Sequence, residues 1–74
     1  MDLTIWQQSI LMALTTEWQT PLQIADQLPQ ASWNISDVNQ SLKDLMHKGL
    51  AQANPVVLGL YRLTTLGTEK MKKA

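Results

Sequence analysis

Gly49 most constrains the fold, because the hydrophobic pattern of the chain changes there. Before it, apolar residues recur at helical spacing, which is typical of helices buried on one face. After it, residues 50–53 and 60–63 form two short strand-like segments, and Asn54-Pro55 and Gly59 mark a loop between them. Glycine also suits the left-handed position that follows a helix. The sequence therefore predicts helices before residue 49 and a β-hairpin after it.

The first helix is expected over residues 3–15. Apolar side chains fall at positions 3, 6, 10, 11 and 14, a spacing that places them on one helical face. Asp2 is expected to cap this helix, since its carboxylate can accept a free backbone amide. Trp6 lies on the apolar stripe, so we expect it in the core.

The second helix has the clearest start signal in the chain, Thr20-Pro21-Leu22-Gln23. Thr20 can cap the helix, and Pro21 suits the first helical position, where no N–H is needed. Gln23 completes a capping box. Pro29 is expected to end this short helix, and a loop to about Trp33 follows it.

The third helix has two possible starts. Asn34 can be the N-cap, with Trp33 and Val38 forming a hydrophobic staple, or the helix can begin from Ser36. In both cases Lys48 suits the C-terminal dipole, and Gly49 ends the helix. The side chains expected on its buried stripe are Val38, Leu42, Leu45 and Met46.

A last short helix is expected after the hairpin, capped by Thr64 and running to about Lys73. The order is then helix, helix, helix, strand, strand, helix. This is a mainly α chain with a small β-hairpin, of the α+β class. A chain of 74 residues has room for one domain. We therefore expect residues 1–74 to form a single winged helix-turn-helix domain.

Three stretches, in this order, resemble winged helix-turn-helix regulators of the MarR and PadR type. They are residues 20–28, the spacing Val38-x3-Leu42-x2-Leu45-x3-Gly49-Leu50, and residues 61–67, which resemble the family's Y-x-L-T-x-x-G. The resemblance covers nearly the whole chain. It implies a DNA-binding transcriptional regulator that acts as a homodimer on double-stranded DNA. In that family the third helix enters the major groove, and the wing touches the neighbouring backbone or minor groove.

The resemblance also implies which residues contact DNA. Asn39 and Gln40 can pair with adenine edges, and Lys43 can reach guanine or a phosphate. Thr20 and Ser36 lie at helix starts, where backbone amides suit a phosphate. The full set implied by the resemblance is Thr20, Ser36, Asn39, Gln40, Lys43, His47 and Arg62. Asp37 and Asp44 are expected on the same face of the third helix.

The net charge is zero, but the charges are unevenly distributed. Residues 1–42 carry four carboxylates and no lysine or arginine, whereas residues 43–74 carry six cations and two carboxylates. A chain polarised in this way can present a basic face to nucleic acid. The alternative is that the last lysines only form a solvated tail.

A second hypothesis follows from the segment between the strands, Pro55-Val56-Val57-Leu58-Gly59-Leu60, which is apolar where a DNA-binding wing is expected to be basic. Half of it can turn inward and pack, or it can form a surface for a protein or a second copy. Trp18 and Trp33 lie in loops, where each can cover the core edge or anchor a partner. The alternative function is a winged-helix protein-interaction module, an adaptor or inhibitor of bacterial or phage origin that does not bind DNA. Its candidate interface residues are Val57, Leu58 and Trp33.

Other functions find little support in the sequence. There is no cysteine, no histidine–carboxylate pair suited to catalysis and no glycine-rich phosphate loop, so we expect neither an enzyme nor a cofactor. His47 is the only histidine and has one near carboxylate, Asp44, so no metal site is expected. The longest apolar stretch, residues 10–14, is too short to cross a bilayer, and no basic region precedes an apolar run near the N-terminus. We therefore expect a cytoplasmic protein that does not enter the membrane.

Overall fold

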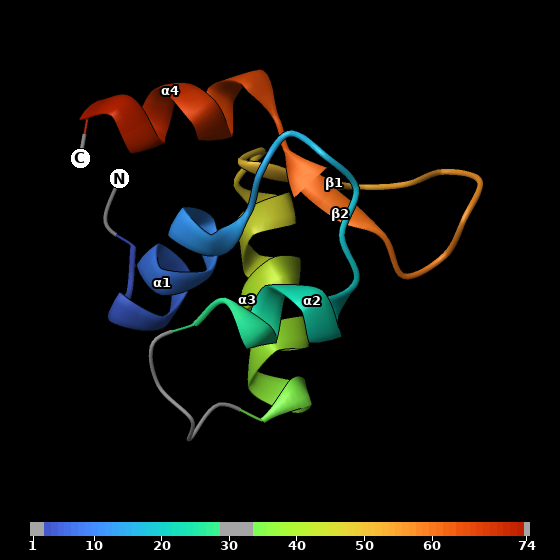
Figure 1. Ribbon diagram of the computed structural model, residues 1–74. Helices are drawn as coiled ribbons and strands as arrows, with labels where there is room; N and C mark the ends of the chain where they lie inside the picture. Colours follow the sequence, from blue (N-terminus) through green and yellow to red (C-terminus); the bar gives the residue numbers. More distant parts are fainter. Residues whose placement is uncertain (1–2, 29–33, 74) are drawn as a thin grey trace.

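The computed structural model describes residues 3–28 and 34–73 and shows the predicted order of elements (Figure 1). The elements are α1 (Ile5–Ala13), α2 (Pro21–Asp26), α3 (Ile35–His47), β1 (Ala51–Ala53), β2 (Tyr61–Leu63) and α4 (Thr65–Lys73). The predicted fold class, mainly helical with one small antiparallel hairpin, is confirmed. Two predictions fall outside the described residues: that Pro29 ends the second helix, and that Trp33 forms a hydrophobic staple with Val38.

The start of α1 differs from the prediction. Thr4 is the N-cap: its Oγ1 accepts from the backbone N of Gln7 at 3.1 Å, and Gln7 Oε1 accepts from the backbone N of Thr4 at 3.1 Å. The prediction that Asp2 caps this helix is therefore wrong, because a reciprocal capping box satisfies two backbone amides two residues later. α1 also ends at Ala13 rather than Thr15, since the backbone of Leu14 is extended.

The buried face of α1 is also rotated from the predicted one. Gln7 is buried with Ile10, Leu11 and Leu14, whereas Trp6 is 45% exposed. The prediction that Trp6 belongs to the core is wrong. The reason is helical geometry: Gln7 lies near the centre of the face formed by Ile10, Leu11 and Leu14, where its amide reaches α3, whereas Trp6 is turned about 90° from that centre.

The start of α2 confirms the prediction in detail. Thr20 Oγ1 accepts from the backbone N of Gln23 at 3.2 Å, and Gln23 Oε1 accepts from the backbone N of Thr20 at 2.9 Å. Pro21 occupies the first turn, and Ile24 is fully buried.

α3 begins at the first of its two predicted starts. Asn34 Oδ1 accepts from the backbone N of Asp37 at 2.9 Å. α3 ends at His47, and Gly49, the residue after the C-cap Lys48, has a φ of +76°. Gly49 donates to the Met46 carbonyl at 3.0 Å, and Leu50 donates to the Leu45 carbonyl at 2.9 Å. This pair of bonds is a Schellman motif, which is the reason for a glycine here.

The buried face of α3 differs at one position from the predicted stripe. Its buried residues are Val38, Ser41, Leu42 and Leu45. Met46 is exposed, so its assignment to this stripe is wrong. Ser41 lies inward instead, because the buried face formed by residues 38, 41, 42 and 45 is as wide as the predicted one but turned by about 40°, away from residue 46.

The hairpin is a three-residue ladder that pairs Ala51 with Leu63, Gln52 with Arg62 and Ala53 with Tyr61. The chain between α1 and α2 adds to its edge, because Gln19 exchanges both backbone hydrogen bonds with Tyr61, at 2.9 and 2.8 Å. No strand-like pattern around Gln19 predicted this pairing. It fixes β2 between β1 and the loop that leads into α2.

α4 closes the core at the C-terminal end of α3 (Figure 1). Thr64 caps it as predicted, since its Oγ1 accepts from the backbone N of Gly67 at 3.0 Å. The same hydroxyl donates to the Gly49 carbonyl at 2.6 Å. The core that these elements enclose consists of Ile10, Leu11, Ala13, Leu14, Ile24, Leu28, Val38, Leu42, Leu45, Leu50, Ala51 and Leu63.

Candidate nucleic-acid interface

One face of α3 is polar and exposed along the whole helix. Ser36, Gln40, Lys43 and His47 are separated by four, three and four residues, and all are exposed. At 3.6 residues per turn this spacing places them in one row, opposite the buried residues. We call these four residues the outward row. Asn39 is exposed beside it. The structure thus brings together the five α3 residues that the resemblance implies.

The two carboxylates of α3 lie to one side of the outward row. By helical geometry, Asp37 and Asp44 are turned about 80° from its centre. Asp37 is exposed, but Asp44 is half-buried. Both carboxylates therefore lie beside the outward row as expected, but that of Asp44 is less exposed because it also bonds to Gln7 of α1.

Asp44 is held by two glutamine side chains. Gln7 Nε2, from α1, donates to Asp44 Oδ2 at 3.2 Å, and Gln40 Nε2 donates to Asp44 Oδ1 at 3.0 Å. The sequence analysis did not single out Gln7. The spacing of Thr4 and Gln7 is a capping-box signal, but nothing local indicates a contact with a residue 37 positions away. The network fixes both the flank of α3 and the side chain of Gln40.

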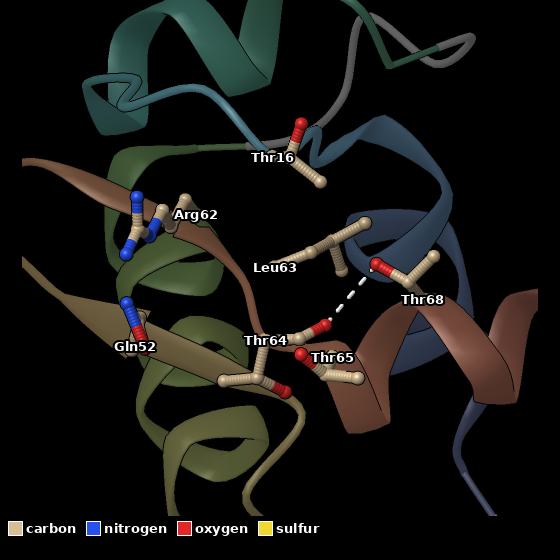
Figure 2. A pocket seen from close by; sticks show the side chains of 7 residues that line it. All are labelled: Thr16, Gln52, Arg62, Leu63, Thr64, Thr65 and Thr68. Atoms are coloured by element: carbon tan, nitrogen blue, oxygen red, sulfur yellow. Dashed lines mark hydrogen bonds between the residues drawn. The ribbon is translucent and has the colours of Figure 1, made fainter.

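Arg62 is immobilised on the outer face of the hairpin. Its guanidinium lies over the Trp18 ring, 4.2 Å from the ring centroid. Gln52, its cross-strand partner, lies beside it (Figure 2) and accepts from Nε at 2.8 Å and Nη2 at 2.9 Å when the amide oxygen faces the arginine. Stacking on one face and hydrogen bonding along one edge leave the Nη1 edge as a donor. Trp18 is half-buried beneath this cation.

A shallow hollow of about 240 Å³ adjoins Arg62 and is lined mainly by threonines (Figure 2). Two of their hydroxyls are used within the fold: Thr64 bonds to Gly49 and Gly67, and Thr68 donates to the Thr64 carbonyl at 3.1 Å. A second hollow, beside Met12 and Gln27, has about 260 Å³. Both are smaller than the roughly 300–1,000 Å³ of small-molecule sites.

The two residues expected at helix starts differ in how available they are. Thr20 uses its oxygen to cap α2 and is half-buried. Ser36 is exposed in the first turn of α3, next to the Asn34 cap. Of the two, Ser36 is therefore the residue that shares a surface with the outward row.

The tip of the wing, residues 55–59, is apolar and exposed. Val56 and Leu58 are 85% and 92% exposed, and Val57 is also exposed. Asn54 Oδ1 accepts from the backbone N of Val56 at 2.8 Å and of Val57 at 2.9 Å, which fixes the turn. The alternative that half of this segment packs inward is therefore wrong for these three side chains. Trp33, the third candidate interface residue, lies outside the described residues.

No protein-family model matches this chain, and a search of curated proteins found no match. The resemblance to MarR and PadR regulators stays a prediction.

Two further observations concern other classes of protein. In the described residues, no three histidine, cysteine, aspartate or glutamate side chains gather where they could hold a metal ion. Across residues 3–28 and 34–73, no helix has the length and apolar character needed to cross a membrane.

Proposed function

We propose that this chain is a DNA-binding transcriptional regulator, or the DNA-binding module of one. In this proposal α3 enters the major groove and the β1–β2 wing lies against the neighbouring backbone. The observation that carries the proposal is the outward row, a continuous exposed polar face on a helix whose opposite face is fixed in the core. A helix of 13 residues is about 20 Å long, and a major groove about 12 Å wide admits it.

The side chains of this face suit base edges and phosphates. Asn39 and Gln40 each carry an acceptor and a donor that can meet an adenine edge. Lys43 can reach guanine or a phosphate, and His47 and Ser36 add hydrogen-bonding groups at the two ends of the row. The two carboxylates lie on the flank, so they do not separate the row from an approaching phosphate backbone.

Arg62 supports the role of the wing. A guanidinium already fixed on Trp18 and Gln52 loses little further freedom when it binds a phosphate. Together with Lys43 and Lys48 it offers two to four phosphate contacts per copy. The logarithm of the binding constant should then fall with the logarithm of salt concentration with a slope of about −2 to −4. Because one copy supplies so few phosphate contacts, we expect two copies to bind DNA as a homodimer.

Titration of a fluorescent duplex at low salt tests the proposal. The double variant Lys43→Ala/Arg62→Ala should weaken binding at least about tenfold and make the salt slope shallower by about 2. Lys72→Ala is the control for losing a cation outside the proposed interface, because it removes one exposed cation from α4 and should leave the affinity nearly unchanged. If the wild-type chain does not bind, or the double variant binds as well as Lys72→Ala, the proposal fails.

The exposed wing tip favours a second candidate, a protein-interaction module that docks through Val57 and Leu58. Exposed apolar side chains that adjoin one another, as Val56, Val57 and Leu58 do, are typical of a protein-interaction site. This candidate predicts a stoichiometric partner that is lost with Val57→Asp or Leu58→Asp but retained with Met12→Asp, an exposed apolar position on α1. Failure to bind heparin, with such a partner recovered, would favour this candidate over DNA binding.

A further inference from the structure

Four residues form a chain of hydrogen bonds from the start of α1 to the outward row of α3. The backbone N–H of Thr4 donates to Gln7 Oε1 at 3.1 Å, and Gln7 Nε2 donates to Asp44 Oδ2 at 3.2 Å. Gln40 Nε2 donates to the other carboxylate oxygen, Oδ1, at 3.0 Å. The chain of bonds runs from Thr4 through the buried side chain of Gln7 to the exposed side chain of Gln40.

The chemistry of these groups allows only one arrangement. A backbone N–H can only donate, so it fixes the oxygen of the Gln7 amide and turns the nitrogen towards Asp44. An ionised carboxylate can only accept, so Gln40 must also face it with nitrogen. The Gln40 oxygen, Oε1, is then directed away from Asp44. No donor to this oxygen is present among the residues that the structure describes.

We propose that Asp44 is a positioning residue that sets base preference by deciding which end of the Gln40 amide meets DNA. This inference rests on the proposed DNA-binding function. With Asp44 in place, Gln40 presents its carbonyl oxygen, which pairs with the exocyclic amino group of adenine or cytosine. The same oxygen is repelled by guanine O6 and thymine O4, which are acceptors in the major groove.

The variant Asp44→Asn should reverse this orientation. The Thr4 N–H still fixes Gln7, so the new amide must accept from Gln7 Nε2 with its oxygen. Its nitrogen then faces Gln40, which can accept only by turning its own oxygen inward. Gln40 would then present its NH₂ group, a donor that suits guanine or thymine.

Selection of bound duplexes from a randomised library at low salt measures this effect. The wild-type chain should favour adenine or cytosine at one position of the bound site, and Asp44→Asn should favour guanine or thymine there, with a change of about tenfold in relative affinity. Asp37→Asn is the matched control. It removes the same charge from an exposed position on the same helix, outside this network.

The possible outcomes separate the two proposals. If Asp44→Asn binds DNA with the same base preference as the wild-type chain and Asp37→Asn, the role of Asp44 is refuted and DNA binding stands. A preference that changes equally in both variants reflects charge alone and also refutes it. If none of the three chains binds any duplex, DNA binding itself is refuted, and the role of Asp44 with it.

Discussion

Three residues in the segment 61–67 join separate parts of the fold through backbone contacts. Tyr61 pairs with Gln19 and so holds the loop before α2 against the hairpin. Thr64 bonds to the end of α3 and to the first turn of α4. Gly67 allows α4 to approach the Leu50 carbonyl, because a Cβ built there would overlap that oxygen. In the Y-x-L-T-x-x-G pattern of this chain, Thr64 is explained by its hydroxyl, Gly67 by the missing Cβ and Leu63 by its burial in the core. The Tyr61 contact uses backbone atoms only, so it does not explain the tyrosine side chain.

Gly67→Ala should destabilise the protein by about 2–3 kcal/mol, because the new methyl group forces α4 away from a backbone oxygen that cannot move independently. The free energy of unfolding in urea measures this.

Gly59→Ala is the control, because it also replaces a glycine by alanine but at a position with no close contact. Gly59 has a φ of +85° but open space around it, so this change should cost only about 1 kcal/mol of left-handed backbone strain. Equal destabilisation by the two variants would contradict a role of Gly67 in close packing.

At the scale of elements, the strongest local signals predicted the helix boundaries. The Thr20 capping box, the Asn34 cap and the Gly49 stop were all found where side-chain chemistry requires them. The same Thr-x-x-Gln spacing occurs at Thr4, where the sequence analysis preferred Asp2 instead.

Other features of the elements depend on contacts between distant residues and could not be predicted locally. Gln7, rather than Trp6, faces the core, because its amide has a partner on α3. Gln19 pairs with β2 as a single residue, which leaves no strand-like pattern in the sequence. For the candidate site, helical spacing predicted the outward row, and Gln40 and Asp44 have the i, i+4 spacing of a helical side-chain pair. The bond from Gln7 to Asp44 and the stacking of Arg62 on Trp18 have no local signal.

The attachment of α4 depends on the Thr64 hydroxyl. Thr64→Val keeps the shape of the side chain but leaves the buried Gly67 amide without its partner, so stability should fall by about 1–2 kcal/mol. Thermal unfolding followed by circular dichroism measures the loss.

Thr65→Val is the control that tests whether replacing the neighbouring threonine lowers stability as much as Thr64→Val does. Thr65 is exposed in the first turn of α4, so its replacement should change stability by less than about 0.5 kcal/mol. A loss as large as that of Thr64→Val would show that the cap is not the cause.

For DNA binding by the whole molecule, the positions of the charged residues matter more than the net charge, which is zero. The cations of the second half of the chain lie on α3, at its C-cap Lys48, on β2 and on α4, and those of α4 are not part of the proposed interface. The loop between β1 and β2 extends away from the helices (Figure 1), and its tip is apolar and exposed. The molecule thus presents two chemically different surfaces, a polar helix face and an apolar turn, and the proposed functions differ in which one meets the partner.

A titration of the ¹⁵N-labelled chain with a short DNA duplex at low salt, followed by amide chemical shifts, tests the central claim most directly. DNA binding through α3 predicts that the largest shifts occur at Ser36, Gln40, Lys43 and His47, with smaller ones near Arg62 and little change at Met12 on α1. Shifts confined to residues 55–59, or no shifts at any duplex concentration, would contradict the proposal that the outward row of α3 faces DNA.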